Sequence, residues 1–549
     1  MTPASWRAPA TGRAVAAGAL GALPWLQPLA GGPSPAVSSW LATAACVVAL
    51  WALARPPLTG PGPRQLAGLA LALVAWGVVV AGQVTPALVY LAGGLALVLL
   101  SAAAGRDPRL STALQWALLG AAGASAVFGL LQYFGGAGRA APWIHAAEVG
   151  VAYANLRQTN QYATLCWIGV AVACFGTLRL RPVLAAGLVA LLAIGCAASA
   201  SRTGLLALGV LAALCAAWPG PDQPRRLVLC ATAIAAYAAG ALLLPLLLEV
   251  FAGVVPGRRL WARLGAGETC VSRRVLWSNV LHLVAQRPLA GWGWGELDFA
   301  HYATLYEGAR FCDILDHAHN LPLHLAVELG APVAVLATAG LLAWVWRRRP
   351  WAEGQPLRRL AWALLALVGL HSLLEYPLWY GPFQLVLGLC IGWLSAAEGA
   401  ANADAKPLAH GRWRRGAGTA LLVAAVGYGA WDYLRVAQIY LPPEQRQAAW
   451  REDTLEHVRA SWLFQGQARF ADVTLATPTR ANATWMYDAA SRALHDSPEP
   501  RVIERVIESA VLLGRDDEAM LHLARYRAAF PQAHAEWQQR QRHPRQVAR

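Results

Sequence analysis

The sequence predicts an all-α fold, a polytopic membrane helix bundle of about 13 spans with a large outer loop and a C-terminal helical domain. Of its 549 residues, 57% are hydrophobic and only 14% are charged, and the mean hydropathy is +0.40. These values are typical of membrane proteins. Apolar runs of about 20 residues, long enough to cross about 30 Å of hydrocarbon, recur from the N-terminus to Tyr433. Beyond Leu441 the chain turns polar, which indicates a soluble tail.

The apolar runs define the predicted spans and the domains between them. The spans are residues 14–30, 36–54, 65–84, 86–104, 112–134, 159–178, 183–200, 203–219, 227–252, 329–346, 360–377, 380–397 and 417–435. We expect an N-terminal transmembrane scaffold (1–150), a transmembrane core with polar motifs at its outer face (151–252), a large outer loop (253–328), C-terminal transmembrane helices (329–438) and a helical tail (439–549). In the tail, the turn at Gly514 between two apolar helical segments and the later Pro531 resemble a tetratricopeptide unit.

Arginine supplies almost all of the net charge of +15, and its distribution sets the predicted topology. The arginines fall in pairs and triplets in alternate connectors, such as those at Arg106, Arg225 and Arg347, and form no single patch. This scatter argues against nucleic acid as a partner. By the positive-inside rule the N-terminus is cytoplasmic, and the odd number of crossings puts the tail on the outer side. A cleaved signal peptide at the first span is disfavoured, since residues 31–33 make a poor cleavage site.

The first polar motif lies at the outer mouth of the sixth span. Its members are Asn155, Arg157, Gln158, Asn160 and Gln161. Buried polar groups at such depth are costly unless they are partnered. We therefore expect this motif to line a wet substrate cavity, in preference to simple capping of the helix.

Arginines mark the outer side at two further places. Arg202 lies in the short turn Ser201–Gly204 between the seventh and eighth spans, and Arg273 and Arg274 begin a predicted helix in the outer loop. An arginine at the outer face breaks the positive-inside pattern. Arg202 is either a snorkelling side chain bound to lipid phosphate or a fixed anion ligand. We favour the anion ligand because Ser and Thr flank it.

Two cysteines, Cys270 and Cys312, lie in the same outer loop. In an oxidising compartment they can form a disulfide that closes the loop. Two unpaired thiols are an equal alternative, because the sequence does not fix the distance between the two Cα atoms.

The candidate reaction centre lies at the end of the outer loop, where His317 and His319 precede Asn320. Imidazoles exchange protons near neutral pH. A metal site of Cys312, His317 and His319 is the competing interpretation, disfavoured because no fourth ligand has a fitting spacing and nearby arginines repel a cation. Purely structural histidines are a second alternative.

A last polar motif, with His371, Glu375 and Tyr376, follows the eleventh span. A carboxylate at the end of a span is costly unless it is paired. Arg202, Arg274 and His319 are the candidate partners of Glu375, and a solvated Glu375 in an interfacial belt of Tyr and Trp is the alternative.

The motifs present and absent in the sequence exclude several types of reaction at the outer face. The sequence has no carboxylate pair suited to a glycosidase, no Gly-x-Ser-x-Gly elbow and no Asp-x-Asp motif. Gly and Trp alternate from Gly291 to Gly295, but no βαβ context surrounds them, so we expect a turn with aromatic platforms and no nucleotide site. Arginines bind phosphate bidentately, and a neutral His accepts a proton from a hydroxyl. Together they suit glycosyl transfer from a lipid diphosphate carrier.

Several motifs resemble the O-antigen ligase and polymerase superfamily. They are the turn Ser201–Gly204, the stretch Arg274–Gly293 and the stretch His317–Gly330. Two further motifs, Asn155–Gln161 and His371–Pro377, are similar to the PglL-type protein O-oligosaccharyltransferases of that superfamily. The tail is the part least covered by the resemblance.

The resemblance implies a bacterial inner-membrane enzyme that moves a preassembled glycan from undecaprenyl diphosphate to Ser or Thr hydroxyls of a periplasmic protein, often a pilin. The loop and the tail are then periplasmic. His319 is the implied base, with Arg202 and Arg274 as ligands of the diphosphate and without a metal or other cofactor. We add Arg273 to the diphosphate ligands, Glu375 to the catalytic residues and His317 as support for the orientation of His319.

Two other functions stay open from the sequence. The first is ligation of O-antigen to the lipid A core, which uses the same donor and base but a sugar hydroxyl as acceptor. The second, from a different class, is a transporter for the lipid-linked glycan, which also gathers arginines on one face but needs no base.

Overall fold

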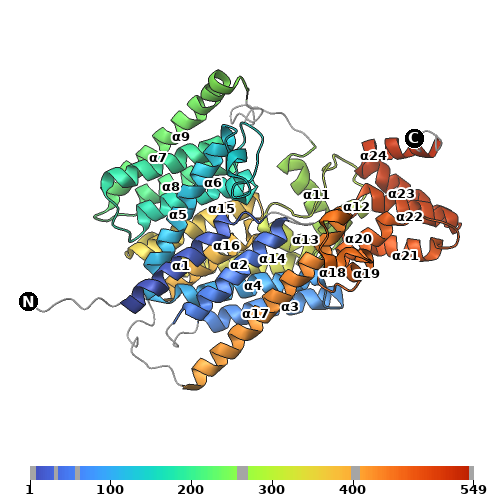
Figure 1. Ribbon diagram of the computed structural model, residues 1–549, viewed down its shortest axis with the longest axis horizontal. Coiled ribbons are helices and arrows are strands. Elements are labelled where there is room, and N and C mark those ends of the chain that lie inside the picture. Colours follow the sequence, from blue (N-terminus) through green and yellow to red (C-terminus); the bar gives the residue numbers. More distant parts are fainter. Residues whose placement is uncertain (1–7, 30–34, 56–61, 256–269, 397–408, 543–549) are drawn as a thin grey trace, which may run out of the picture.

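The chain folds into a bundle of helices that carries a group of shorter helices at one end (Figure 1). The computed structural model describes residues 8–29, 35–55, 62–255, 270–396 and 409–542, and these residues form helices and loops without a β-strand. The predicted all-α fold is therefore confirmed for the described residues.

Each predicted span coincides with one helix of the described chain, although several helices begin or end elsewhere than predicted. These helices are α1 (Ala8–Leu26), α2 (Pro35–Leu53), α3 (Gly62–Ala81), α4 (Pro86–Gly105), α5 (Pro108–Tyr133), α6 (Thr159–Phe175), α7 (Pro182–Ala198), α8 (Arg202–Ala217), α9 (Gln223–Ala252), α14 (Ala331–Arg348), α15 (Pro356–Leu374), α16 (Gly381–Ala396) and α17 (Ala409–Ala437). Among the described residues, α2, α4, α5, α9 and α15 are long and apolar enough to cross a membrane, and α3, α7, α8 and α16 are shorter apolar helices. The chain is thus an α-helical membrane protein.

The most central helix is α6, and its burial follows from its sequence. Every side chain from Gln161 to Phe175 is buried, because the helix is apolar around its whole circumference. It packs against α5, α7, α8 and α15. This burial fixes the start of α6, and with it Asn160, at the end of the bundle that carries the site.

Small residues bring α4 and α16 into the most extensive helix contact of the bundle. A side chain on Gly388 would overlap Ser101 and the carbonyl of Val98, and one on Gly392 would overlap the carbonyl of Ala102. In a membrane such close approach of backbones replaces the hydrophobic driving force that water provides elsewhere.

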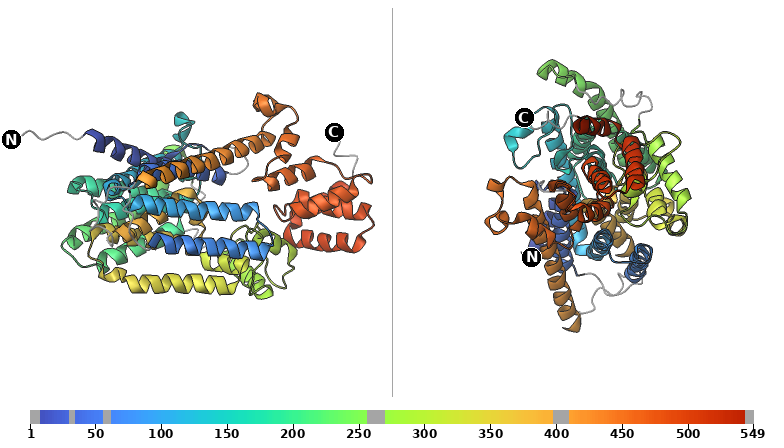
Figure 2. Two further views of the ribbon diagram at one scale, coloured as in Figure 1. Left: turned by 90° about the horizontal axis from the view of Figure 1, so that it is seen from below. Right: turned by 90° about the vertical axis from the view of Figure 1, so that its right-hand side faces the viewer.

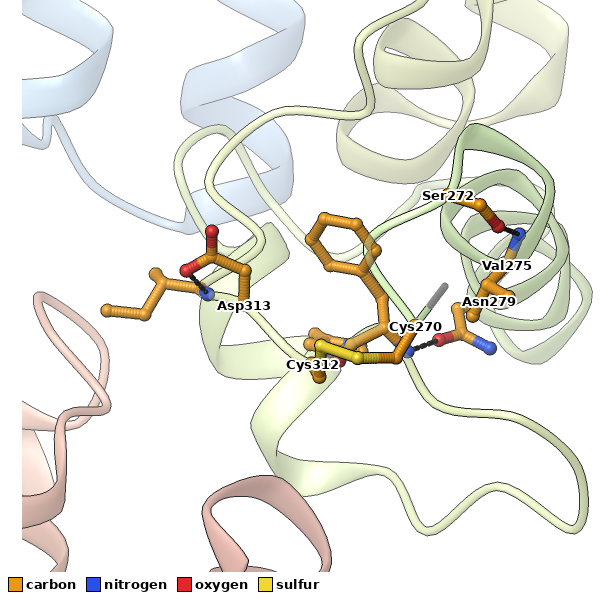
Figure 3. Close-up of a disulfide and its surroundings, with 9 residues drawn as sticks. Cys270, Ser272, Val275, Asn279, Cys312 and Asp313 are labelled. Atoms are coloured by element: carbon orange, nitrogen blue, oxygen red, sulfur yellow. Dashed lines mark hydrogen bonds between the residues drawn. A yellow bond between two sulfur atoms is a disulfide. The ribbon is translucent and has the colours of Figure 1, made fainter. Parts of the chain in front are cut away.

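The outer loop contains the helices α11 (Arg273–Gln286), α12 (Leu297–Ala303) and α13 (Leu321–Leu329). Cys270 and Cys312 form a disulfide with their Cα atoms 5.5 Å apart, which decides between the two alternatives left by the sequence (Figure 3). Beside it, the Asn279 side chain on α11 donates to the carbonyl of Ala309 at 2.9 Å and accepts from the N–H of Phe311 at 2.8 Å. The segment before the histidines is thus tied to α11.

The Gly-Trp turn packs its backbone against the end of α13. The N–H of Trp292 donates to the carbonyl of Val327 at 2.8 Å, and the N–H of Gly293 donates to that of Glu328 at 3.0 Å. Gly291 and Gly330 have φ values of +74° and +95°, a region that favours glycine.

The tail docks on α12. Its main helices are α20 (Gln465–Leu475), α21 (Ala483–Ala493), α22 (Pro500–Leu512), α23 (Asp516–Ala529) and α24 (Pro531–Arg542). The Tyr302 hydroxyl lies 2.8 Å from His522 Nδ1, and His495 Nδ1 lies 2.7 Å from a carboxylate oxygen of Glu296. Figure 2 places these helices beyond the end of the bundle, beside α11–α13. The predicted helix, Gly turn, helix order is present in α22, Gly514 and α23.

We expect Gly330→Ala to destabilise the protein, because its Cβ would overlap the carbonyl of Leu289 in a backbone conformation that L-residues avoid. The cost is about 1–3 kcal/mol, measured as a lower thermal midpoint in detergent. Gly308→Ala is the control, since a Cβ there has open space. Equal midpoints for the two variants would refute the packing described for the turn.

Candidate active site

The site is built around the contact between the imidazole of His319 and the carboxylate of Glu375. His319 Nδ1 lies 2.6 Å from Glu375 Oε2, and the two side chains are 18% and 9% exposed. Because an ionised carboxylate only accepts hydrogen bonds, we assign the proton to Nδ1, which leaves the lone pair of Nε2 available. Nε2 makes no hydrogen bond within the described part of the chain. It is therefore free to accept a proton from a substrate.

Glu375 follows the last residue of α15 and has two further partners. Its Oε1 accepts hydrogen bonds from Arg273 and, at 2.9 Å, from Nδ2 of Asn160. Burial favours a raised pKa for Glu375, but the hydrogen bond with His319 and the charge of Arg273 outweigh burial, and the pKa lies below its usual value. Glu375 is thus ionised at neutral pH. Of the three candidate partners, His319 contacts Glu375, whereas the arginine that contacts it is Arg273, which was not among the candidates.

Helix starts surround the Glu375 carboxylate. Asn160 is the second residue of α6, and its Oδ1 accepts a hydrogen bond of 2.6 Å from Ser201, the N-cap of α8. Arg273 begins α11, and Asn320 is the N-cap of α13. Each helix N-terminus carries about half a positive charge. The starts of α6 and α11 contact the carboxylate directly through Asn160 and Arg273, and the start of α8 is joined to it through Asn160.

His319 has an unusual backbone conformation that its neighbours hold in place. Its φ is +49°, which costs a non-glycine residue about 1–3 kcal/mol. The preceding carbonyl, of Ala318, accepts a hydrogen bond of 3.1 Å from the Trp277 indole. The following Asn320 caps α13 and donates to the carbonyl of Leu373 at 3.1 Å. Both neighbours are thus fixed, and the imidazole is aimed at Glu375.

The three arginines predicted to bind the diphosphate differ in their exposure and in their contacts. Arg202 begins α8, directly after Ser201, and its exposed guanidinium makes no hydrogen bond or ion pair to another described residue. Arg274 is exposed on α11, whereas Arg273 beside it is half-buried and bound to Glu375. Arg202 therefore presents its charge to an incoming anion, whereas the charge of Arg273 is already shared with a carboxylate.

A cavity of about 870 Å³ opens beside the site, between α2, α3, α4, α13 and the segment 376–380. Of the predicted cavity residues, Asn155, Arg157, Gln158, Gln161 and Tyr376 line it. Asn160 and His371 are not part of its described lining. Asn160 instead belongs to the Glu375 network, and His371 Nδ1 lies 3.0 Å from the hydroxyl of Thr164 in the protein interior.

Two of the cavity residues, Asn155 and Gln158, also hydrogen-bond to the backbone. Capping of the helix was the alternative that the sequence left open for this motif. Asn155 Nδ2 donates to two backbone carbonyls, at 2.8 and 2.9 Å, and one of these carbonyls belongs to α1. Gln158 caps α6 by accepting from the N–H of Gln161 at 2.7 Å. Arg157 is exposed. Capping and lining therefore occur together in this motif.

His317 is separated from His319 by an aromatic ring. Its imidazole stacks on Tyr376 with centroids 4.0 Å apart, and the Tyr376 ring stands edge-on to His319 at 4.9 Å. Asp316 Oδ1 lies 3.1 Å from His317 Nδ1, but without the alignment of a hydrogen bond. Burial lowers the pKa of His317, so it is neutral at pH 7. The competing metal site loses its thiolate, because the sulfur of Cys312 is bonded to Cys270.

The other side of the cavity was not predicted as a site. Its polar lining includes Asp298, Asp316, His324 and Glu328, with Trp379 beside them. The only signal in the sequence was the expected aromatic platform at Trp294, which does line the cavity. The carboxylates come from α12, the loop and α13, whose packing no local pattern reveals.

Three family models match the chain. The model described as O-Antigen ligase matches residues 187–338, which include Arg202, both loop arginines and His319. The model described as Protein glycosylation ligase matches residues 152–175, which carry the amide motif. The model described as Virulence factor membrane-bound polymerase, C-terminal, matches residues 359–544, from α15 to the tail.

Two curated relatives come from Acinetobacter baylyi (strain ATCC 33305 / BD413 / ADP1). A general O-oligosaccharyltransferase is 28% identical over 185 residues, which cover 33% of this chain and 31% of the relative. A ComP-specific O-oligosaccharyltransferase is 26% identical over 124 residues, 23% of this chain and 22% of the relative. The chain thus spans less than a third of the length of either. Together with the family models, these matches show that the chain is similar to PglL-type protein O-oligosaccharyltransferases and to O-antigen ligases.

Proposed function

We propose that this protein is a glycosyltransferase, a protein O-oligosaccharyltransferase that moves a preassembled glycan en bloc from undecaprenyl diphosphate to Ser or Thr hydroxyls of periplasmic proteins, including pilin-like ones. The observation that carries the proposal is the His319–Glu375 pair with an unoccupied Nε2, set among helix starts and beside two exposed arginines. The names of the relatives support the same reaction class.

The reaction needs a base and a stabilised leaving group. His319 Nε2 takes the proton from the acceptor hydroxyl, whose oxygen attacks the anomeric carbon of the first sugar. The bond between that carbon and the phosphate oxygen breaks, and the diphosphate leaves with the electron pair. Glu375 stabilises the imidazolium that forms, because its carboxylate already holds Nδ1–H at 2.6 Å.

The leaving diphosphate carries the charge that the arginines match. Arg202 and Arg274 hold it by charge-assisted hydrogen bonds. Arg273 contributes through Glu375, which it keeps ionised and in position. All chemistry is then supplied by side chains and helix starts, without a metal or other cofactor.

The site and the tail are proposed to lie in the periplasm, with the bundle in the inner membrane. The support is the alternation of arginine-rich connectors with connectors that lack Lys and Arg. The disulfide between Cys270 and Cys312 agrees with an oxidising compartment for the loop.

The runner-up is ligation of O-antigen to the lipid A core, which the match to the O-Antigen ligase model favours. One experiment separates the two: mass spectrometry of intact periplasmic proteins from cells with and without the gene. Loss of a glycan mass from one or more proteins supports the proposal. Unchanged protein glycans together with lost O-antigen on lipopolysaccharide would support the runner-up.

The base is tested by His319→Gln, which keeps a polar side chain but cannot accept the proton. We expect transfer to fall by about 10²–10⁴-fold, measured with purified protein and lipid-linked glycan, while donor binding is kept. Full activity of this variant would refute the role of His319 as the base. His282→Gln, an exposed histidine on α11, is the matched control and is expected to keep full activity.

The roles of the three arginines are tested by measuring kcat and the KM for the donor separately for each Ala variant. Arg202→Ala and Arg274→Ala are expected to raise the KM for the donor, because they remove diphosphate contacts. Arg273→Ala is expected to lower kcat instead, by about tenfold or more, because Glu375 loses its counter-charge. If Arg273→Ala raises only the donor KM, Arg273 is a direct ligand of the diphosphate and the positioning role is wrong.

A further inference from the structure

The cavity beside the site differs in charge from the arginine side. Three carboxylates line it, those of Asp298, Asp316 and Glu328, and Arg157 is the single Lys or Arg of its described lining. Arg202, Arg273 and Arg274 are not among the lining residues, and Arg273 is bound to Glu375. In Figure 1, α8 and α9 lie on one side of α6 and α15, and α3 and α4 lie on the other.

The carboxylates of the cavity can still accept a cation. The side chain of Asp316 is 62% exposed. A carboxyl group exposed to this extent is ionised at neutral pH, so Asp316 is charged. Burial raises the pKa of Asp298 well above its usual value. A cation beside these groups is stabilised by Asp316 and favours the ionised form of Asp298.

Buried polar atoms in the lining have unused hydrogen-bonding capacity. Glu328 is 1% exposed, and its Oε2 accepts from the N–H of Gly295 at 3.0 Å and lies 3.2 Å from His324 Nε2. Its Oε1, the Nδ1 of His324 and both ring nitrogens of His317 have no hydrogen-bond partner in the described chain. Buried polar atoms are rarely left unsatisfied in proteins. The residues that carry these atoms, His317, His324 and Glu328, make one part of the cavity wall polar.

The remainder of the lining is apolar and aromatic. Trp294 and Trp379 stack in parallel with centroids 5.8 Å apart. Leu73 of α3 and Leu91, Leu95 and Val98 of α4 continue the wall into the bundle. Val98 lies about 18 Å along α4 from its start. The cavity therefore has a polar mouth and an apolar floor within the membrane-spanning part.

The cavity reaches the base. A smaller crevice, which His319 and Glu375 line, shares the side chains of His317, Tyr376 and Trp379 with the cavity. The Tyr376 ring is 4.9 Å from the imidazole of His319. A hydroxyl held at this end of the cavity is thus next to the group that must deprotonate it.

We propose that this cavity is the acceptor site, and that it takes a polypeptide segment in which a Ser or Thr is flanked by apolar and basic residues. The inference rests on the proposed function. A diphosphate is disfavoured there, because carboxylates repel it and the arginines that suit it lie outside. A glycan would leave its hydroxyls unpaired against the apolar floor. Apolar side chains fill that floor, and a Lys or Arg pairs with Asp316 and Asp298.

The geometry therefore assigns the two substrates to opposite sides of the His319–Glu375 pair. The donor diphosphate lies on the side of Arg202 and Arg274, and the acceptor enters from the carboxylate side. An acidic residue next to the modified Ser or Thr is disfavoured, because it would face Asp316.

The test uses the purified full-length protein, lipid-linked glycan, and the acceptor protein identified by mass spectrometry. The acceptor is made in two forms, with Lys or with Glu next to the modified residue. We expect the wild type to prefer the Lys form, and Asp316→Asn to raise the KM for that form by about fivefold with an unchanged donor KM. The preference for Lys over Glu is expected to fall by a similar factor.

Asp313→Asn is the matched control, since it removes the same charge from the same loop at a residue outside the cavity. Asp298→Asn is the second variant and is expected to act as Asp316→Asn does. If these variants raise the donor KM alone, the glycan occupies the cavity and the proposal is wrong. If they change neither KM nor the charge preference, no substrate uses the cavity. A wild type that modifies no protein contradicts the proposed function itself, which is a different result.

Discussion

The carboxylate of Glu375 is the interaction on which the site depends. It joins the start of α6 through Asn160, the start of α11 through Arg273 and the loop through His319. A buried carboxylate without partners would take up a proton or destabilise the fold. Its ionisation and the orientation of the imidazole therefore require the same packing.

Close contacts between backbone segments and one disulfide maintain that packing. Glycines at 291 and 330 let the Gly-Trp turn lie against α13, and the disulfide and Asn279 tie the loop to α11. The tail packs on the outer side of α12. Tyr302 within α12 contacts His522 of the tail, and Glu296 directly before α12 contacts His495. The left-handed backbone of His319 is sustained by these surroundings.

The charged residues near the His319–Glu375 pair differ from those that line the cavity. Helix starts and exposed arginines favour an anion on one side of the His319–Glu375 pair. Carboxylates, imidazoles and indoles form the other side, where Arg157 is the single cationic residue of the described lining. Placing a diphosphate and a hydroxyl-bearing partner on opposite sides of one base lets a transferase distinguish its two substrates by charge.

The sequence alone determined the helices, since runs of apolar residues are local and coincide with α1–α9 and α14–α17. It also singled out His319 and Glu375 and named His319 as one of three candidate partners of Glu375, because a carboxylate at the end of a span needs a partner. Tertiary structure decided which arginine binds Glu375, since neighbours such as Arg273 and Arg274 on a helix point about 100° apart and only the orientation of α11 selects one. It also decided that Asn160 belongs to the Glu375 network, that Cys270 pairs with Cys312, and that Asp298, Asp316 and Glu328 share one cavity. These contacts join segments far apart in the chain, and their distances depend on how the helices pack.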